Sequence, residues 1–201
     1  MGNLIAIEGA DCVGKTTVID MLKKKMPSDT LFFREPGGTE FGEKMRDIIK
    51  NESVRDPYVD TLLFSATRLK LIKEKIAPAI KSGKTVILDR FILSTYVYQY
   101  FTNNQDEEIL NLIKTTERIF IKELNIEPAY FLLECPIEEI YKRMKGRDIE
   151  KDSFEETIEK TIEGYNFMSN TLKGNIEKIN TNRAPNEILE ELLDKIKTLG
   201  H

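Results

Sequence analysis

The sequence predicts an α/β fold in which a parallel sheet of five strands lies between two layers of helices. Short apolar runs alternate along the chain with longer segments in which apolar residues recur at helical spacing. This alternation is typical of βαβ units and of a parallel sheet. No internal repeat, Ser/Gly linker or low-complexity stretch interrupts the 201 residues. We therefore expect one domain, residues 1–201, with a three-layer αβα architecture.

The expected strands are short runs rich in apolar residues. In chain order they are Leu4–Ile7, Leu31–Phe33, Thr85–Leu88, Ala129–Cys135 and Ile176–Ile179.

The expected helices carry apolar residues three or four positions apart, which places these residues on one face. We interpret these faces as core rather than as cofactor sites. The series are Val18, Leu22 and Met26; Leu62, Ala66, Leu69, Ile72, Ile76 and Ile80; Ile109, Ile113, Thr116, Phe120 and Leu124; Phe154, Ile158, Ile162, Tyr165, Met168 and Leu172; and Ile188, Leu192, Ile196 and Leu199.

Composition narrows the possible functions. A net charge of −4 gives no global positive field for nucleic acid, so we expect no nucleic-acid partner. No apolar stretch approaches the roughly 18 residues of a membrane span, and the chain opens on a strand pattern rather than a signal peptide. We expect a cytoplasmic protein without membrane contact. The single histidine, His201, is the last residue, which argues against Ser-His or multi-histidine metal chemistry.

A Gly-rich loop follows the first expected strand and opens the first expected helix. Its sequence, GADCVGKT, matches G-x-x-x-x-G-K-S/T. Such loops direct backbone N–H groups and a helix N-terminus at phosphate oxygens. We expect the lysine to reach the terminal phosphates and the first threonine to ligate Mg²⁺. The ATP-phosphate residues are predicted to be Gly9, Ala10, Asp11, Cys12, Val13, Gly14, Lys15, Thr16 and Thr17.

Two other interpretations of this loop are weaker. A plain Gly-rich β-to-α turn explains a glycine but not the lysine and two threonines that follow. A switch GTPase would carry an N-K-x-D run and a D-x-x-G after a strand, and neither pattern occurs outside the loop.

A kinase that acts on another phosphate needs a second anion site, and arginine presents a planar fork of donors suited to it. Arg34 and Arg90 follow expected strands, and Arg46 and Arg68 lie on expected helices. The carboxyl ends of parallel strands are where such folds bind ligands. Any one of these arginines could instead be a surface ion-pair partner, but together with the phosphate loop they favour a nucleoside monophosphate kinase.

Four motifs make the chain resemble the thymidylate kinases, the dTMP-phosphorylating branch of the nucleoside monophosphate kinases, over nearly its whole length. They are EGADCVGKTT from Glu8, REPGGT from Arg34, LFSATR from Leu63 and DRFILSTYVYQ from Asp89.

The resemblance implies a role for each matching residue. Phe64 would stack on thymine, Arg68 would donate to its O4, and Thr95 and Gln99 would meet its other polar edge. Asp11 would accept from the deoxyribose 3′-hydroxyl, and Tyr98 would exclude a 2′-hydroxyl. Arg46 and Arg90 would bind the acceptor phosphate. From the chemistry of phosphoryl transfer, we further expect Thr16 to hold Mg²⁺, with Asp89 oriented through water. The substrate-binding set is Asp11, Glu35, Arg46, Phe64, Arg68, Arg90, Thr95, Tyr98 and Gln99. Family members are commonly homodimers, and the resemblance puts adenine contacts in the Asn180–Ala184 turn.

The chain also departs from the family pattern. Cys12 stands where one branch has an arginine for the transferring phosphate, and the other branch supplies that charge from a lid. We interpret the charged segment Lys142–Asp152 as that lid, although a solvated helix connection would look alike. The predicted catalytic residues are Lys15, Arg90, Arg143 and Arg147, with Lys145 as a further cation.

Other acceptors remain open at this point. Phe91 stands where Tyr or His is common, and Tyr100-Phe101 replaces glycines, so acceptor specificity could differ. The alternatives to a dTMP kinase are a kinase for dUMP, dGMP or a nucleoside, and a nonenzymatic nucleotide-binding switch.

Overall fold

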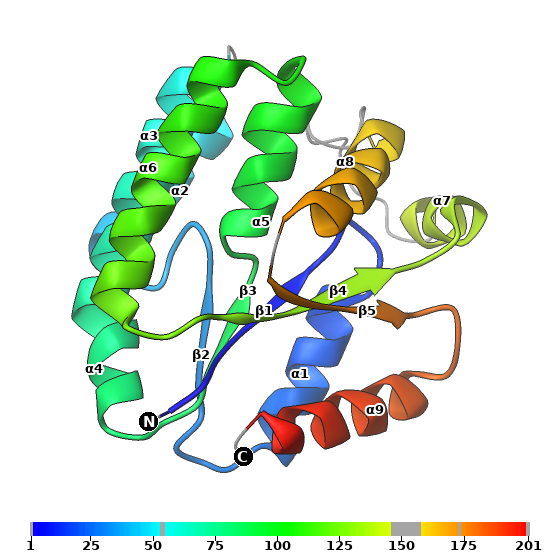
Figure 1. Cartoon of the computed structure of the whole chain (residues 1–201). Helices are drawn as coiled ribbons and strands as arrows, with labels where there is room; N and C mark the ends of the chain where they lie inside the picture. Colours follow the sequence, from blue (N-terminus) through cyan, green and yellow to red (C-terminus); the bar gives the residue numbers. More distant parts are fainter. Residues whose placement is uncertain (1, 53–54, 146–157, 173, 200–201) are drawn as a thin grey trace.

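In the computed structural model, residues 2–52, 55–145, 158–172 and 174–199 are described. Five parallel strands form one sheet in the order β2-β3-β1-β4-β5 (Figure 1). All five expected strands are present, with ends within two residues of the predicted ones. They are β1 (Leu4–Glu8), β2 (Leu31–Arg34), β3 (Val86–Asp89), β4 (Ala129–Glu134) and β5 (Asn175–Asn180). The α/β prediction with a five-stranded parallel sheet is confirmed.

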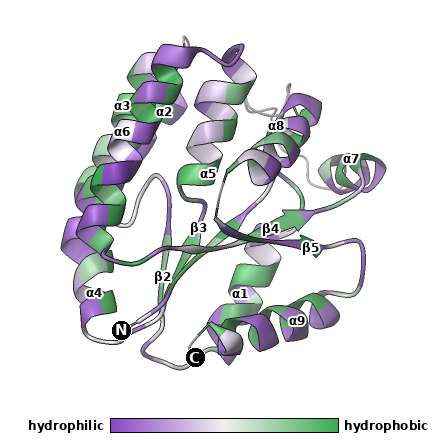
Figure 2. Ribbon diagram, viewed as in Figure 1, coloured by the Kyte–Doolittle hydropathy of each residue, from purple (hydrophilic) through white to green (hydrophobic). Residues whose placement is uncertain are grey.

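The apolar runs that predicted the strands also explain why the centre of the sheet is buried. All five residues of β1 are buried, and β3 and β4 are buried except at their last residues, whereas the edge strand β5 is mostly exposed or half-buried. Figure 2 shows the same gradient in hydropathy, from green on the central strands to purple on β5. Central parallel strands are covered on both faces, so they read as continuous apolar runs.

Helices cover both faces of the sheet. Helices α1 (Lys15–Lys25) and α9 (Pro185–Thr198) pack against each other on one face. The other face carries most of the remaining helices (Figure 1). These are α2 (Glu40–Asn51), α3 (Pro57–Leu71), α4 (Ala77–Lys81), α5 (Ile92–Thr95), α6 (Glu107–Leu124) and α8 (Ile158–Thr171), while α7 (Ile137–Lys145) lies beyond the end of β4.

The predicted core face of α3 is wrong in its first half. Leu62 is 54% exposed and Ala66 is also exposed, while Thr61, Ser65 and Arg68 are buried. Relative to the predicted orientation, the helix is rotated about its axis, so that its polar side faces the acceptor cavity and the neighbouring α6. Helical spacing alone placed the wrong side inward.

Two π-helical turns, which hold one more residue than an α-turn, interrupt long helices. The first, η1 (Ile72–Ile76), joins α3 to α4, and the second, η2 (Tyr96–Tyr100), continues α5 into the 3₁₀ turn η3 (Phe101–Asn103). Thr95, at the end of α5, and Tyr98 and Gln99 of η2 all line one cavity. π-Turns of this kind are frequent at functional sites.

The expected lid is only partly described. Lys142–Lys145 form the last turn of α7. The rest of the lid, including Arg147, lies outside the described residues, as do Phe154 and His201. Among the helices that the structure describes, none is both long and apolar enough to cross a membrane.

Candidate active site

The phosphate loop joins β1 to α1 as expected, and its glycines meet backbone constraints. Gly9 has φ 138°, and a Cβ there would lie 2.5 Å from the carbonyl oxygen of Leu133. Gly14, at φ 106°, precedes the first residue of α1. Positive φ values are costly for residues with a side chain. The loop therefore opens directly onto the N-terminus of α1, where exposed N–H groups and the helix dipole favour an anion.

Lys15 lies folded over this loop. Its Nζ donates to the carbonyl oxygens of Gly9 at 2.9 Å and Ala10 at 2.7 Å, and lies 3.7 Å from the Asp11 carboxylate. Burial, together with the positive charge of Arg90, lowers the pKa of Lys15 to about 8. A phosphate in the loop would raise this pKa again, because an anion favours the ammonium.

Arg90 connects the loop to the other side of the site. It follows β3 with φ 68°, and its guanidinium donates to Asp11 at 2.5 Å and to the Tyr165 hydroxyl at 2.9 Å. Burial alone would raise the pKa of Asp11, but Arg90 and Lys15 outweigh it and hold this pKa below its ordinary value. Asp11 is thus a carboxylate shared by two cations.

A buried carboxylate, Glu8, supports Arg90 from behind. It accepts from the backbone N–H of Phe91 at 2.7 Å, the Ser94 hydroxyl at 2.6 Å and the Tyr165 hydroxyl at 3.1 Å. Burial raises the pKa of Glu8, although these donors and Arg90 oppose the shift. Glu8 therefore ties the end of β1 to the start of α5, which follows Arg90.

Three residues of this network were not predicted. Glu8 and Ser94 lie inside two of the four quoted motifs. A carboxylate at the end of an apolar strand, directly before the phosphate loop, was the signal that could have identified Glu8. Tyr165 was assigned to the core, and it is 3% exposed. Its hydroxyl nevertheless contacts Arg90, Ser94 and Glu8, which helical spacing could not indicate.

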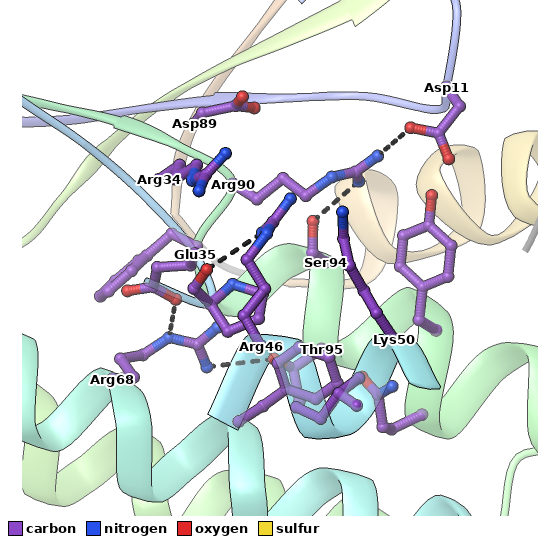
Figure 3. A pocket seen from close by; sticks show the side chains of 16 residues that line it. Asp11, Arg34, Glu35, Arg46, Lys50, Arg68, Asp89, Arg90, Ser94 and Thr95 are labelled. Atoms are coloured by element: carbon purple, nitrogen blue, oxygen red, sulfur yellow. Dashed lines mark hydrogen bonds and ion pairs between the residues drawn. The ribbon is translucent and has the colours of Figure 1, made fainter. Parts of the chain in front are cut away.

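A cavity of about 210 Å³ lies beside Arg90, between the ends of the strands and α2, α3 and α5 (Figure 3). It brings together every residue of the predicted substrate-binding set: Asp11, Glu35, Arg46, Phe64, Arg68, Arg90, Thr95, Tyr98 and Gln99.

One end of the cavity is rigidly built around Arg68, which is 2% exposed. Its Nε donates to Glu35 at 2.5 Å and its Nη1 to the Thr95 hydroxyl at 3.0 Å. Its guanidinium carbon lies 5.1 Å from the centre of the Phe91 ring and 5.6 Å from that of Phe120. Contacts in several directions fix the orientation of this fork of donors.

Glu35 gives this end an unusual buried acid. One carboxyl oxygen accepts from Arg68, while Oε1 is buried without a hydrogen-bond partner among the described residues. Burial raises the pKa of Glu35 to about 7, although the Arg68 guanidinium opposes the shift. A buried polar atom without a partner is costly, so this oxygen is suited to contact a polar ligand or water.

The other end of the cavity carries cations that are less constrained. Arg46 donates to the Pro36 carbonyl at 3.0 Å and is half-buried, and Lys50, one turn further along α2, is exposed. Lys50 was not predicted, because a lysine on an amphipathic helix normally indicates only a solvated face. Tyr98 separates this end from α8, with its ring centre 5.1 Å from the Arg90 guanidinium carbon.

The two predicted magnesium ligands have suitable chemistry. Thr16 exposes its side chain at the start of α1, and Asp89 ends β3 beside the loop, in register with Ile7 of β1. Asp89 Oδ1 is buried without a hydrogen-bond partner in the described part of the chain. Hydroxyl and carboxylate oxygens are the ligands that Mg²⁺ prefers, so these residues fit the ion.

Arg143, predicted as a lid arginine, lies against the phosphate loop. It donates to the carbonyl oxygens of Val13 at 3.2 Å and Thr181 at 2.9 Å, and to Glu139 at 3.2 Å. The Thr181 hydroxyl donates to the same Val13 carbonyl at 2.7 Å. The Asn180–Ala184 turn, predicted to contact adenine, is therefore attached to the loop through Thr181.

Comparisons with known proteins agree with the motifs. A family model described as thymidylate kinase matches residues 7–196. A thymidylate kinase from Caldanaerobacter subterraneus subsp. tengcongensis is 38% identical, with 82% of this chain and 80% of that protein covered. One from Prochlorococcus marinus strain NATL2A is 36% identical, with 98% and 97% covered. The crystal structure of an Ehrlichia chaffeensis thymidylate kinase shares the fold, with a TM-score of 0.76 at 23% identity over 98% of this chain and 100% of that one.

Proposed function

The chain belongs to the thymidylate kinase family and is a dTMP kinase, and we propose that the phosphate loop and the nine cavity residues perform the transfer in the roles that follow. The observation that carries these roles is the convergence of all nine residues on a single cavity beside the loop. Such convergence of residues from separate motifs is what a two-substrate site requires.

The rigid end of the cavity suits the base. Arg68 can donate to a carbonyl of the thymine ring, Thr95 of α5 accepts from Arg68, and Gln99 of η2 lines the same cavity. Phe64 supplies an aromatic face for stacking. A site built to hydrogen-bond a polar edge rejects analogues that leave its buried groups unpaired, so this end selects the base.

The other end suits the acceptor phosphate and faces the phosphate loop. The second pKa of a phosphate monoester is about 6, so its attacking oxygen needs no protein base at neutral pH. That oxygen bonds to the γ-phosphorus of ATP while the bond from this phosphorus to the bridging oxygen breaks, and ADP leaves with the electron pair. Lys15 and Arg90 neutralise the negative charge that spreads over the transferring group.

We propose Thr16 and Asp89 as the residues that would hold Mg²⁺ when ATP is bound, and the ion would neutralise negative charge on the donor phosphates. Asp11 is proposed to accept from the 3′-hydroxyl. It would remain a carboxylate in this role, because Arg90 and Lys15 keep its pKa low.

The two lid arginines are proposed to differ in role. Arg143 has its donors on Val13, Thr181 and Glu139, which supports a role in holding the loop and the adenine turn. Arg147 remains the proposed source of the charge that Cys12 cannot supply.

We propose a homodimer formed through α2, α3 and α6. These adjacent helices expose large apolar side chains, namely Phe41, Ile48, Val59, Leu62 and Ile119. A second copy that presents the same face would bury them. Sedimentation should show a dimer for the wild type and a monomer for Leu62→Glu, and a monomeric wild type would refute this proposal. On family grounds we propose a cytoplasmic enzyme that acts in dTTP synthesis.

A coupled ADP-release assay with ATP and Mg²⁺ tests the proposed roles. The wild type should release ADP with dTMP in strong preference to dUMP, dGMP, AMP or thymidine. Lys15→Met should bind dTMP and lose at least about 10²-fold in turnover. A preference for another acceptor would refute the base contacts, and near-normal turnover of Lys15→Met would refute the role of that lysine.

A further inference from the structure

The charges that line the acceptor cavity do not cancel, and the surplus lies on α2. The lining includes five cationic side chains, Arg34, Arg46, Lys50, Arg68 and Arg90, and three carboxylates, Asp11, Glu35 and Asp89. Three of the cations have carboxylate partners: Arg34 pairs with Glu43, Arg68 with Glu35 and Arg90 with Asp11.

Two cations have no carboxylate within ion-pair distance among the described residues, although Glu43 and Asp89 act on Arg46 from farther away. Arg46 donates only to the Pro36 carbonyl, and Lys50 makes no hydrogen bond or ion pair in the described part of the chain. They are four positions apart on α2, which puts them on one face of the helix. Two cations without an ion-pair partner thus face the cavity from the same direction.

Figure 3 shows where this surplus points. Lys50 rises from α2 into the cavity on the side where Ser94 and Arg90 lie, away from Arg68 and Thr95. This is the end assigned above to the acceptor phosphate. A phosphate monoester at neutral pH carries a charge of about −1.5 to −2, which two cations would neutralise.

We propose that Lys50 is a further acceptor-binding residue of this dTMP kinase and that its ammonium contacts the 5′-phosphate together with Arg46. The inference rests on the proposed orientation of dTMP in the cavity. The two side chains would bind the phosphate in different ways. Arg46 is held in place by its hydrogen bond to the Pro36 carbonyl, whereas Lys50 is a flexible point charge. Lys50 can therefore follow the phosphate as the acceptor enters.

The binding of dTMP and of thymidine, measured by calorimetry, tests this proposal, because thymidine keeps the base and sugar but lacks the phosphate. Lys50→Gln should weaken dTMP binding about five- to tenfold, since a hydrogen bond to a charged group is lost. Thymidine binding should stay within about twofold of wild type, and Lys50→Arg should retain most dTMP affinity. Added salt should weaken dTMP binding less in Lys50→Gln than in the wild type.

Lys44 provides the matched control. It lies on the same helix, is exposed and pairs with Glu40 at 2.7 Å, and it does not line the cavity. Lys44→Gln removes the same charge and should leave dTMP binding unchanged. The proposal is overturned if Lys50→Gln binds dTMP like the wild type, if Lys44→Gln has an equal effect, or if thymidine and dTMP weaken alike. Failure of the wild type itself to bind dTMP would instead refute the proposed function.

Discussion

The two ends of the acceptor cavity are built in opposite ways. At the base end, Arg68 is 2% exposed and is held by Glu35, Thr95 and two aromatic rings. At the phosphate end, Arg46 is half-buried with one contact to a backbone carbonyl, and Lys50 is exposed. The first end has its donors fixed before a ligand enters, whereas the second offers charge without a fixed geometry.

This difference follows from what each end must do. Discrimination between bases depends on buried polar groups that a wrong base leaves unpaired, so those groups must not move to accommodate it. A phosphate is recognised largely through its charge, and long cationic side chains can adapt to it.

The largest effect is expected at Arg90, which lies between the proposed phosphate end of the cavity and the loop. Arg90→Met should lower turnover about 10²- to 10³-fold, because it removes charge from the transition state. Thymidine binding, measured by calorimetry, should fall much less than turnover, because Arg90 reaches the sugar only through Asp11. Arg118→Met, an exposed position on α6, is the control and should be fully active. A variant that loses thymidine affinity as strongly as turnover would show that the two ends are not separable.

Arg68→Met should damage the base end and the fold together. The change leaves Glu35 buried without its ion-pair partner, which should lower the free energy of unfolding by about 3 kcal/mol. It should also lower kcat/KM for dTMP about 10²-fold. Urea unfolding and steady-state kinetics measure the two effects. The double variant Arg68→Met/Glu35→Gln should regain stability but not activity, and equal stability of single and double variants would contradict this account.

A smaller effect is expected on the pH dependence of the unfolding free energy, through the titration of Glu35. Its pKa is about 7 in the fold and 4.5 ordinarily, so between these values the folded chain holds a proton that the unfolded chain releases. The stability that this group contributes is complete below pH 4.5 and is lost as the pH rises through about 7. Glu35→Gln lacks this titration. Relative to that variant, the wild type should lose roughly 2 kcal/mol of unfolding free energy between pH 5 and pH 8. Parallel pH profiles of the two proteins would show that Glu35 stays ionised beside Arg68.

Most of the fold could be predicted because it rests on local patterns. Buried parallel strands appear as apolar runs, and each strand end was placed within two residues. The substrate-binding residues, from Asp11 to Gln99, were named through the resemblance of their motifs to the thymidylate kinases, and the fold brings them to one cavity.

What the sequence could not predict depends on how helices are rotated in the fold. Leu62 was assigned to the core and is exposed, because α3 turns its polar side inward. Tyr165 satisfies the helical pattern of a core residue, and only the packing of α8 against α5 brings its hydroxyl to Arg90. Lys50 looks like any solvated lysine until the cavity beside it is known.

The crystal structure of the protein with dTMP bound is the most direct test of the central claim, that one end of the cavity selects the base and the other binds the phosphate. We expect the thymine ring to lie against Phe64 with a carbonyl oxygen on Arg68, and the phosphate to lie among Arg46, Lys50 and Arg90. A reversed nucleotide, or a phosphate that contacts neither residue of α2, would contradict it.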